Sequence, residues 1–502
     1  MGKTTKILVV LAVLLALGVA AYFWTAKRDA SAIAFSDHCA GCHGVELQGT
    51  STGPALLGNR LRNGNSTEAL IASIIKAHHE KGQFVWQDEL SDPMIKGLAL
   101  LISERRQQFP STSTSFETYS TEQQVKTQYY QLQSEHVTAL KSRPYSLAAL
   151  PDGRFLVAEK TRGLSFINAA GQQGDLIKGT PKIWEEIVSV GNTHLILGTL
   201  LDVALHPQYA TNGWIYLSYS DRCQEGCGVP WPESMVRVVR GKIQNGQWVD
   251  NEEIWSVHPD YYTVAPDNVA CGRLAFDKEN FLYITVGGKW TYDNLHKMDT
   301  PYGKIHRVKD DGTIPQDNPF WLSDNQREET STKHTVWSYG HRTMQGLTSH
   351  PVSGDIWSTE MGPQGGDEVN KIERGGNYGW PLYTNGLDYD STPITIGLDL
   401  GLDFPIEETI LPVVDFTPAP AISNHTFHQG DQFTEWENDM LVGSLKAQTL
   451  YRLRIVDGKL TEQEKLLTGL GRIRDIEMGA DGFVYIVIEH GDKGSLIRVR
   501  PE

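Results

Sequence analysis

Two cysteines and a histidine near the start of the 502-residue chain have the spacing of a haem-attachment motif. Cys39, Cys42 and His43 stand in the stretch SDHCAGCHGVEL. In a C-x-x-C-H motif the two thiols bond covalently to the haem, and the adjacent histidine binds its iron. A disulfide or a thioredoxin-like pair is the alternative for two cysteines at this spacing. The flanking residues favour haem, so we predict one haem c with His43 as its proximal iron ligand.

The residues on both sides of this motif predict a small helical domain. Ser66 precedes a run in which apolar residues recur at helical spacing, and Ser91 followed by Pro93 is typical of a second helix start. A helix, a haem loop and a closing helix resemble a class I cytochrome c. The resemblance covers residues 32–108 and predicts a small all-α domain.

The sixth ligand of the haem iron stays open. Cytochromes of this type usually place a methionine before the last helix, but Gln83 stands at that position. His78, His79 and Met94 are the other candidates. Met94 falls inside the predicted last helix, where its expected role is core packing.

The first residues of the chain predict export. Residues 7–24, ILVVLAVLLALGVAAYFW, carry no charge, and Lys3 and Lys6 precede them. A run of this length nearly spans a bilayer core, so we predict a transmembrane helix within residues 1–28. A signal peptide cleaved before Ala21 is the alternative. Because haem c is attached outside the cytoplasmic membrane, we expect the chain on the periplasmic side of a bacterial cytoplasmic membrane, either anchored or released by cleavage.

Cysteine use and charge agree with an exported protein. Cys223 and Cys227 are close enough for a small disulfide loop in an oxidising compartment, which leaves Cys271 unpaired. The formal net charge is −16 and no run is rich in Lys or Arg, which argues against a nucleic-acid partner.

A repeat follows a linker rich in Ser and Thr at residues 109–127. Six later segments each join a turn containing Pro, Asp, Asn or Gly to a strand rich in β-branched and aromatic residues. They begin near residues 150, 206, 276, 350, 433 and 479. Periodic β units of this kind predict an all-β, six-bladed β-propeller over residues 128–502.

Several stretches of this domain resemble one enzyme family. They include RPYSLAALPDGRFLVAEK, GRLAFDKENFLYITVGG and GRIRDIEMGADGFVYIV, and most specifically YGHR, GPQGGDE and NYGWP between residues 339 and 381. They resemble the soluble glucose, sorbosone and aldose-sugar dehydrogenases that depend on pyrroloquinoline quinone (PQQ). The resemblance implies a six-bladed propeller, PQQ, calcium, and oxidation of the C1 hydroxyl of a sugar to a lactone.

Four cations match positions that contact the cofactor in this family. They are Arg342, Lys446, Arg472 and Arg474. PQQ is a tricarboxylate, and Arg side chains bind carboxylates with paired hydrogen bonds. Arg472 and Arg474 are two residues apart, so on a strand they point to the same face.

Two pairs of residues match calcium positions of the family. Gly362 and Pro363 stand where backbone carbonyls bind the calcium of the cofactor, an ion that prefers oxygen ligands. That calcium would polarise the quinone carbonyl. Glu368 and Tyr378 match a second, structural calcium site, although ordinary packing explains such residues as well.

The proton acceptor of the family is missing. Val269 stands at its histidine position, four residues before Arg273, and a valine accepts no proton from a substrate hydroxyl. Three neighbouring family positions also differ and are occupied by Asn268, Leu197 and Thr343. Candidates to replace the base are His341, His194 and Asp267. The catalytic base therefore remains unassigned.

Three functions fit these observations. The first is an anchored quinohaemoprotein oxidoreductase that oxidises a sugar (aldose) or alcohol and passes electrons to its own haem and then to a respiratory-chain acceptor. The second is a catalytically decayed propeller that binds PQQ or a carbohydrate beside an electron-transfer cytochrome. The third is a docking module for that cytochrome. We favour the first, while substrate identity and oligomeric state do not follow from the sequence.

Overall fold

The computed structural model describes residues 30–57, 61, 64–79, 90–107, 120–184, 186–190, 193–223, 232–323 and 330–502. The predicted anchor, Gln83, Cys227 and most of the predicted linker lie outside this part of the chain. No helix within the described residues has both the length and the apolar character that crossing a bilayer requires.

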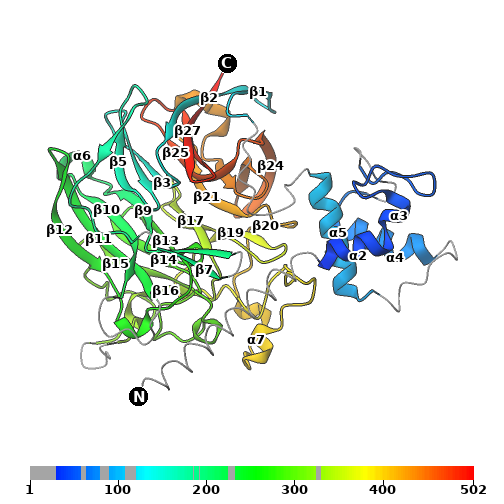
Figure 1. Ribbon diagram of the computed structural model, residues 1–502. Helices are drawn as coiled ribbons and strands as arrows, with labels where there is room; N and C mark the ends of the chain where they lie inside the picture. Colours follow the sequence, from blue (N-terminus) through cyan, green and yellow to red (C-terminus); the bar gives the residue numbers. More distant parts are fainter. Residues whose placement is uncertain are drawn as a thin grey trace.

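The described residues of the N-terminal domain, drawn in blue beside a large β domain in Figure 1, include four helices. They are α2 (Ala30–His38), α3 (Ala40–His43), α4 (Thr67–His79) and α5 (Asp92–Arg106). The predicted helix starts are confirmed: the Ala69 amide donates to Ser66 Oγ (3.2 Å) and the Met94 amide to Ser91 Oγ (3.4 Å). The helices enclose a core that includes Phe35, Leu70 and Leu98. This arrangement bears out the predicted all-α domain.

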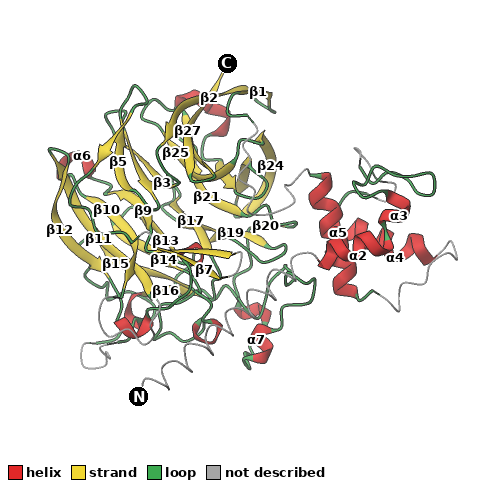
Figure 2. Ribbon diagram, viewed as in Figure 1, coloured by secondary structure: helices red, strands yellow, loops and turns green. Residues whose placement is uncertain are grey.

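The described residues of the larger domain form six antiparallel sheets of four or five strands, which confirms the predicted β-propeller (Figure 2). The first sheet contains β3 (Pro144–Ala149), β4 (Phe155–Glu159), β5 (Gly163–Ile167) and β6 (Gln173–Leu176). The second contains β9 (Leu200–Leu205), β10 (Ile215–Arg222), β11 (Ser234–Gln244) and β12 (Gln247–Trp255). The third contains β13 (Cys271–Phe276), β14 (Phe281–Val286), β15 (Lys304–Lys309) and β16 (Val336–Tyr339).

The chain continues around the ring in the same order. The fourth sheet contains β17 (Met344–Ser349), β18 (Ile356–Glu360), β19 (Asp367–Lys371) and β20 (Val414–Phe416). The fifth contains β21 (Ile422–Phe427), β22 (Met440–Ser444), β23 (Thr449–Val456) and β24 (Lys459–Thr468). Outside the six sheets lie the hairpin of β7 (Glu186–Val190) and β8 (Thr193–Leu197), and the short helices α6 (Tyr209–Asn212) and α7 (Ile396–Asp399). Each of the six repeats in the sequence supplies the second strand of its sheet, namely β4, β10, β14, β18, β22 and β26.

The sixth sheet closes the ring by joining the two ends of the domain. Its strand order is β1 (Gln123–Lys126), β2 (Gln131–Leu140), β27 (Lys493–Pro501), β26 (Val484–His490) and β25 (Arg472–Met478). In Figure 1 the cyan strand β2 lies beside the red strand β27. Main-chain hydrogen bonds therefore leave no open seam between the first and last parts of the propeller.

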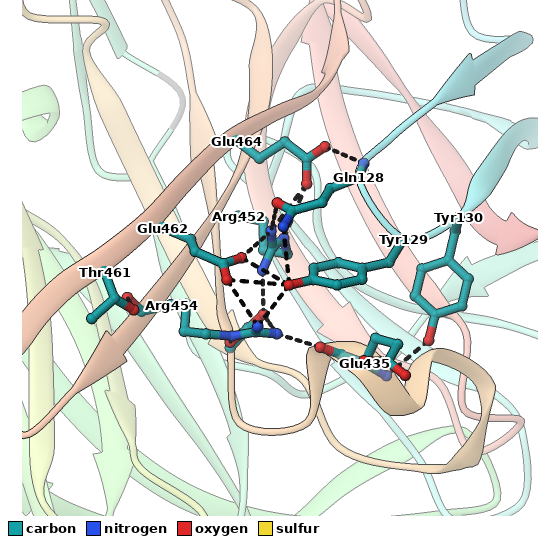
Figure 3. Close-up of polar contacts among 10 residues, drawn as sticks. Gln128, Tyr129, Tyr130, Glu435, Arg452, Arg454, Thr461, Glu462 and Glu464 are labelled. Atoms are coloured by element: carbon teal, nitrogen blue, oxygen red, sulfur yellow. Dashed lines mark hydrogen bonds and ion pairs between the residues drawn. The ribbon is translucent and has the colours of Figure 1, made fainter.

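Side chains fasten this closure to the fifth sheet (Figure 3). Arg452 on β23 is fully buried and donates to Glu462 (2.8 Å) and to Gln128 (3.2 Å) just before β2. Arg454 donates to the Tyr129 hydroxyl (2.9 Å), and that hydroxyl lies 3.1 Å from Glu462 Oε1. The incoming chain is thus held by two cations that belong to a neighbouring blade.

A second polar group lies at the centre, where the first strands of the six sheets contact one another. Arg273 on β13 is 1% exposed and donates to Asp202 on β9 (3.2 Å) and Asp475 on β25 (3.3 Å). It also donates to the carbonyls of Tyr145 on β3 (3.1 Å) and Gln345 on β17 (2.8 Å). A side-chain hydrogen bond joins Asn424 on β21 to Asp475. Each first strand contributes one of these residues, so the family-like Arg273 is the hub of the ring.

Candidate haem and cofactor sites

The helical domain places the haem motif on one short turn. The His43 and Cys42 amides donate to the Cys39 carbonyl (3.0 and 3.1 Å), which brings the three side chains together. Thr50 Oγ1 donates to the Cys42 carbonyl (2.6 Å). A Cβ atom on Gly53 would lie 2.7 Å from that carbonyl oxygen, so glycine is required for the loop to approach.

The histidine is oriented for a metal. His43 Nδ1 lies 2.8 Å from the Pro54 carbonyl oxygen. A carbonyl oxygen can only accept a hydrogen bond, so Nδ1 carries the hydrogen and donates it. This bond leaves Nε2 with its lone pair for iron, as in most protein metal sites. Cys39 and Cys42 are free thiols, and burial, with Cys42 nearby, raises the pKa of Cys39 to about 11. The donor set fits a covalently attached haem.

The sixth ligand remains a prediction. Met94 packs against the core of the helical domain, the role expected for it. The side chains of His78 and His79, like Gln83, lie outside the described residues.

Three cations, of which Arg472 and Arg474 are buried, share one carboxylate in the propeller. Arg472 and Arg474 point to the same face of β25, as strand alternation predicts, and both contact Glu489 Oε1 on β26 (2.9 and 2.7 Å). Lys160, at the end of β4, lies 3.1 Å from Glu489 Oε2. Glu489 is 1% exposed. We call Lys160, Arg472, Arg474 and Glu489 the cation cluster.

The electrostatics of the cation cluster favour a further anion. Burial would raise the pKa of Glu489, but Arg474, Lys160 and Arg472 hold that pKa well below its usual value. Burial, aided by Arg474, lowers the pKa of Lys160 to about 7. Arg474 Nε is buried without a hydrogen-bond partner among the described residues. An anionic ligand would supply an acceptor for this nitrogen.

The other two predicted cofactor cations lie near Asp367. Arg342 donates to the carbonyls of Met361 (2.9 Å) and Gly362 (3.1 Å). Burial raises the pKa of Asp367 to about 7, and Arg342 and Lys446 oppose this rise. Lys446 itself lies in the turn between β22 and β23, where its Nζ contacts Glu104 of the helical domain (2.5 Å).

The predicted calcium residues surround one small cavity. Gly362, Glu368 and Tyr378 line it together with Arg342 and Glu360. Burial and the neighbouring Glu360 raise the pKa of Glu368 to about 8, and a divalent cation between two such carboxylates would relieve their repulsion.

Backbone oxygens would have to complete a calcium site there. Within the described ranges, no three His, Cys, Asp or Glu side chains converge on a common point. The Tyr378 hydroxyl donates to the Lys371 carbonyl (2.6 Å) and accepts from the Glu373 amide (2.9 Å), so only the Tyr378 carbonyl is suited to a metal. Pro363 is buried beside the cavity wall at Gly362. The carbonyl-rich donor set is compatible with calcium.

Among the described side chains of the loop that contains Val269, none is free to replace the family base. Asp267, one of the candidates, is buried and accepts from the Thr199 amide and hydroxyl (both 2.8 Å) and from Ser220 (2.6 Å), so it is used by the fold. The loop is also tightly packed, because a Cβ atom on Gly287 would lie 2.0 Å from the Val269 carbonyl.

Three further positions named in the sequence, His341, Leu197 and Thr343, are buried in the described structure. His341 is fully buried between Ser338 (2.9 Å) and Glu360 (3.0 Å). Leu197 is buried at the end of β8, and Thr343 lies beneath Glu360, to which its amide donates (3.2 Å). The side chains of Asn268 and His194 lie outside the described residues.

Sequence reasoning missed three residues of these sites. Lys160 and Glu489 complete the cation cluster, and Glu104 reaches Lys446 from another domain. Lys160 and Glu489 both lie at the ends of repeat strands, which was the available signal. Cys223 is disulfide-bonded and Cys271 is free, as predicted.

Comparisons with known proteins agree with this architecture. A family described as glucose/sorbosone dehydrogenase matches residues 141–498, and a cytochrome c family matches residues 29–98. The aldose sugar dehydrogenase YliI of Escherichia coli is 32% identical over 71% of this chain and 90% of its own length. Quinoprotein glucose dehydrogenase B of Acinetobacter calcoaceticus is 23% identical over 69% of this chain and 83% of its own length.

Solved structures match the same region. The apo-form crystal structure of the soluble aldose sugar dehydrogenase from Escherichia coli superposes with a TM-score of 0.62 at 28% identity, covering 74% of this chain and 100% of that one. A crystal structure of a glucose dehydrogenase gives a TM-score of 0.63 at 30% identity, covering 73% and 98%. The chain therefore belongs to the glucose/sorbosone dehydrogenase family, and it carries a cytochrome c domain in front of the propeller.

Proposed function

We propose that the chain is a PQQ-dependent dehydrogenase of sugars or alcohols that passes electrons to its own haem c. The observation that carries this proposal is the cation cluster, in which Lys160, Arg472 and Arg474 surround the single carboxylate of Glu489. When bound, PQQ supplies a quinone that accepts two electrons from the substrate. Arg472, Arg474, Arg342 and Lys446 would hold its carboxylates and ring system.

The fused cytochrome c domain supports the electron-transfer part of the proposal. A two-electron quinone needs a one-electron outlet, and an acceptor on the same chain is present at a high effective concentration. Calcium at the cavity of Gly362 and Glu368 would complete the cofactor site and keep Glu368 ionised.

An exported location is part of the same proposal. The apolar run at residues 7–24, the haem c motif and the disulfide at Cys223 all suit the periplasmic side of a bacterial membrane. A respiratory-chain component would then be the final electron acceptor, and we propose that the N-terminal segment anchors the chain close to it.

A second candidate is a propeller that binds PQQ or a carbohydrate without turnover. The observation that favours it is Val269 at the position of the family base, together with the structural use of Asp267 and His341. An enzyme lacking a general base loses a rate factor of ~10²–10⁴. Such a loss would turn a dehydrogenase into a binding protein.

One reconstitution experiment separates the two. The full chain is loaded with PQQ and calcium, and the absorbance of its reduced haem is followed after addition of a panel of aldoses and alcohols. Substrate-dependent haem reduction supports the dehydrogenase. PQQ binding with no reduction by any substrate supports the binding propeller. The absence of PQQ binding overturns the dehydrogenase and leaves only a propeller that binds a carbohydrate, which a sugar-binding titration then tests.

A further inference from the structure

Helix α5 of the cytochrome c domain has two buried faces. Ile95, Leu98, Ala99 and Ile102 pack into the core of the helical domain. Lys96, Leu100, Glu104 and Gln107 follow one another at intervals of three or four residues and therefore share a different face. Leu100 on that second face is fully buried although it lies outside the helical core. In Figure 1, α5 stands on the side of the cytochrome c domain that faces the propeller.

The second face of α5 contacts loops of the propeller, and strand β24 contacts Gln107 at the C-terminal end of the helix. Lys96 Nζ donates to the Asn385 carbonyl (3.1 Å), and Lys465 Nζ donates to Gln107 Oε1 (3.0 Å). Between these ends, Leu100 lies against Gly365, since a Cβ atom on that glycine would be 3.7 Å from Leu100 Cδ1. We call this contact the α5 interface.

Close approach at the α5 interface depends on a glycine. A Cβ atom on Gly97 would lie 2.3 Å from Ser391 Oγ and 2.6 Å from Ser31 Oγ. These two hydroxyls are hydrogen-bonded to each other across the two domains. Ser391 is 1% exposed, so the domains exclude water here. The surfaces of the two domains are complementary in shape at the α5 interface, so the domains are docked and not only joined by the chain between them.

One contact of the α5 interface involves a predicted cofactor cation. Lys446 Nζ lies 2.5 Å from Glu104 Oε1, and the two side chains are only 18% and 15% exposed. Such a partly desolvated pair is less screened than a surface ion pair. Lys446 is also within electrostatic reach of Asp367, beside Arg342 and Gly362. Lys446 therefore faces the cytochrome c domain and the cofactor site at once.

We propose that Glu104 holds Lys446 in place of a carboxylate of the cofactor, so that docking of the cytochrome c domain and binding of PQQ oppose each other. The inference rests on the proposed function. Because coupling between two binding events is reciprocal, a docked domain weakens cofactor binding and a bound cofactor loosens the α5 interface. The cytochrome c domain thereby controls access to its own electron donor.

The sign of the effect distinguishes this coupling from a purely structural ion pair. If Glu104 competes for Lys446, removal of its charge strengthens PQQ binding. If Glu104 only orients Lys446 for the cofactor, removal of its charge weakens PQQ binding. If Glu104 neither competes for Lys446 nor orients it, the affinity for PQQ stays the same.

The test compares full-length Glu104→Gln with the wild type in the presence of calcium. PQQ is titrated at low ionic strength, and the quenching of tryptophan fluorescence gives its Kd. We expect Glu104→Gln to bind PQQ about tenfold more tightly, with the difference shrinking at high salt. Arg498→Ala is the control, because its ion pair with Glu135 lies within the propeller and involves neither Lys446 nor the α5 interface, and its Kd should equal that of the wild type. Haem content and circular dichroism verify folding.

A second readout follows the domains themselves. Small-angle X-ray scattering should show a larger radius of gyration for the wild type after PQQ addition, and for Glu104→Gln before it. An unchanged or weaker PQQ affinity of Glu104→Gln overturns the coupling. If neither protein binds PQQ, the proposed function fails and the coupling fails with it. Should Glu104→Gln misfold, Glu104→Asp, which shortens the reach to Lys446, is expected to strengthen binding by a smaller factor, and unchanged binding would again overturn the coupling.

Discussion

At the scale of single residues, Arg474 offers the sharpest test of cofactor binding. One of its nitrogens contacts Glu489 (2.7 Å), and its buried Nε has no hydrogen-bond partner among the described residues. A carboxylate of a ligand would fill that position. We therefore predict that Arg474→Ala weakens PQQ binding about 10- to 100-fold, since a charge-assisted hydrogen bond contributes ~1.5–3 kcal/mol.

The measurement is the same fluorescence titration, with Arg498→Ala as control. Arg498 on β27 pairs with Glu135 on the neighbouring strand β2, where both side chains are partly exposed and neither contacts the cation cluster. Its loss should leave the Kd of PQQ unchanged. Equal affinities of Arg474→Ala and the wild type would exclude the cation cluster as the cofactor site.

Val269 is the second residue with a defined expectation. If the protein is a dehydrogenase, Val269→His restores a proton acceptor and should raise substrate-dependent haem reduction, by at most ~10²–10⁴-fold. A smaller gain is expected because Asn268 and Leu197 also differ from the family. Stopped-flow absorbance of the haem gives the rate once PQQ and calcium saturation are verified.

Val269→Ala is the control for Val269→His, since it enlarges the loop without adding a base. A gain in both variants would indicate better access for the substrate. If the wild type already reduces its haem rapidly and the His variant is no faster, another residue is the base.

At the scale of elements, stability depends on how β1 and β2 join the last sheet. Arg452 is fully buried and bound to Asp439 (2.6 Å), Glu462 and Gln128. Removing one partner of a buried ion pair leaves an uncompensated charge, at a cost of ~3–5 kcal/mol. We predict that Arg452→Ala lowers the free energy of unfolding by about this amount in urea denaturation.

Arg154→Ala provides the comparison for Arg452→Ala. Arg154 pairs with Asp152 on an exposed turn, where side chains are 40% and 53% exposed, and such pairs contribute ~0–1 kcal/mol. Equal urea midpoints for the two variants would mean that the main-chain hydrogen bonds of β1, β2 and β27 hold the two ends of the propeller together without help from Arg452.

At the scale of the whole molecule, buried histidines make stability depend on pH. His306 is fully buried, and its Nε2 lies 3.1 Å from the Pro301 carbonyl while Nδ1 lies 2.9 Å from Thr335 Oγ1. Burial lowers the pKa of His306 to about 3, below its ordinary value of 6.5. Between these values the unfolded chain binds a proton that the folded chain does not, so stability falls as the pH drops from 6.5 towards 3.

We predict that His306→Asn loses less stability over this range than the wild type. The difference in slope should approach ~1.4 kcal/mol per pH unit, which is the free energy equivalent to one unit of pKa. Urea denaturation at several pH values between 6.5 and 4 measures it. Parallel curves for the two proteins would show that His306 is protonated in the folded state.

Much of the architecture follows from local patterns in the sequence. The haem motif, the helix caps at Ser66 and Ser91, and the six turn-and-strand repeats are each contained within a few residues. The caps and the repeats were confirmed at their expected places, and haem attachment stays a prediction. Caps and strand alternation depend on neighbouring backbone geometry, which is why the sequence is sufficient to predict them. That Arg472 and Arg474 share a face of β25 was predicted in the same way, from strand alternation alone.

The partners of these residues were decided only by the tertiary structure. Lys160 meets Glu489 across 329 positions of the chain, and Glu104 meets Lys446 across 342. No local pattern encodes such pairs, because closure of the ring and docking of α5 bring distant segments together. By itself the sequence determined the two domains, and it predicted His43 as a haem ligand and Val269 at the position of the family base. Only the folded chain determined that one carboxylate is shared by three cations, and that the cytochrome c domain binds a cation of the proposed cofactor site.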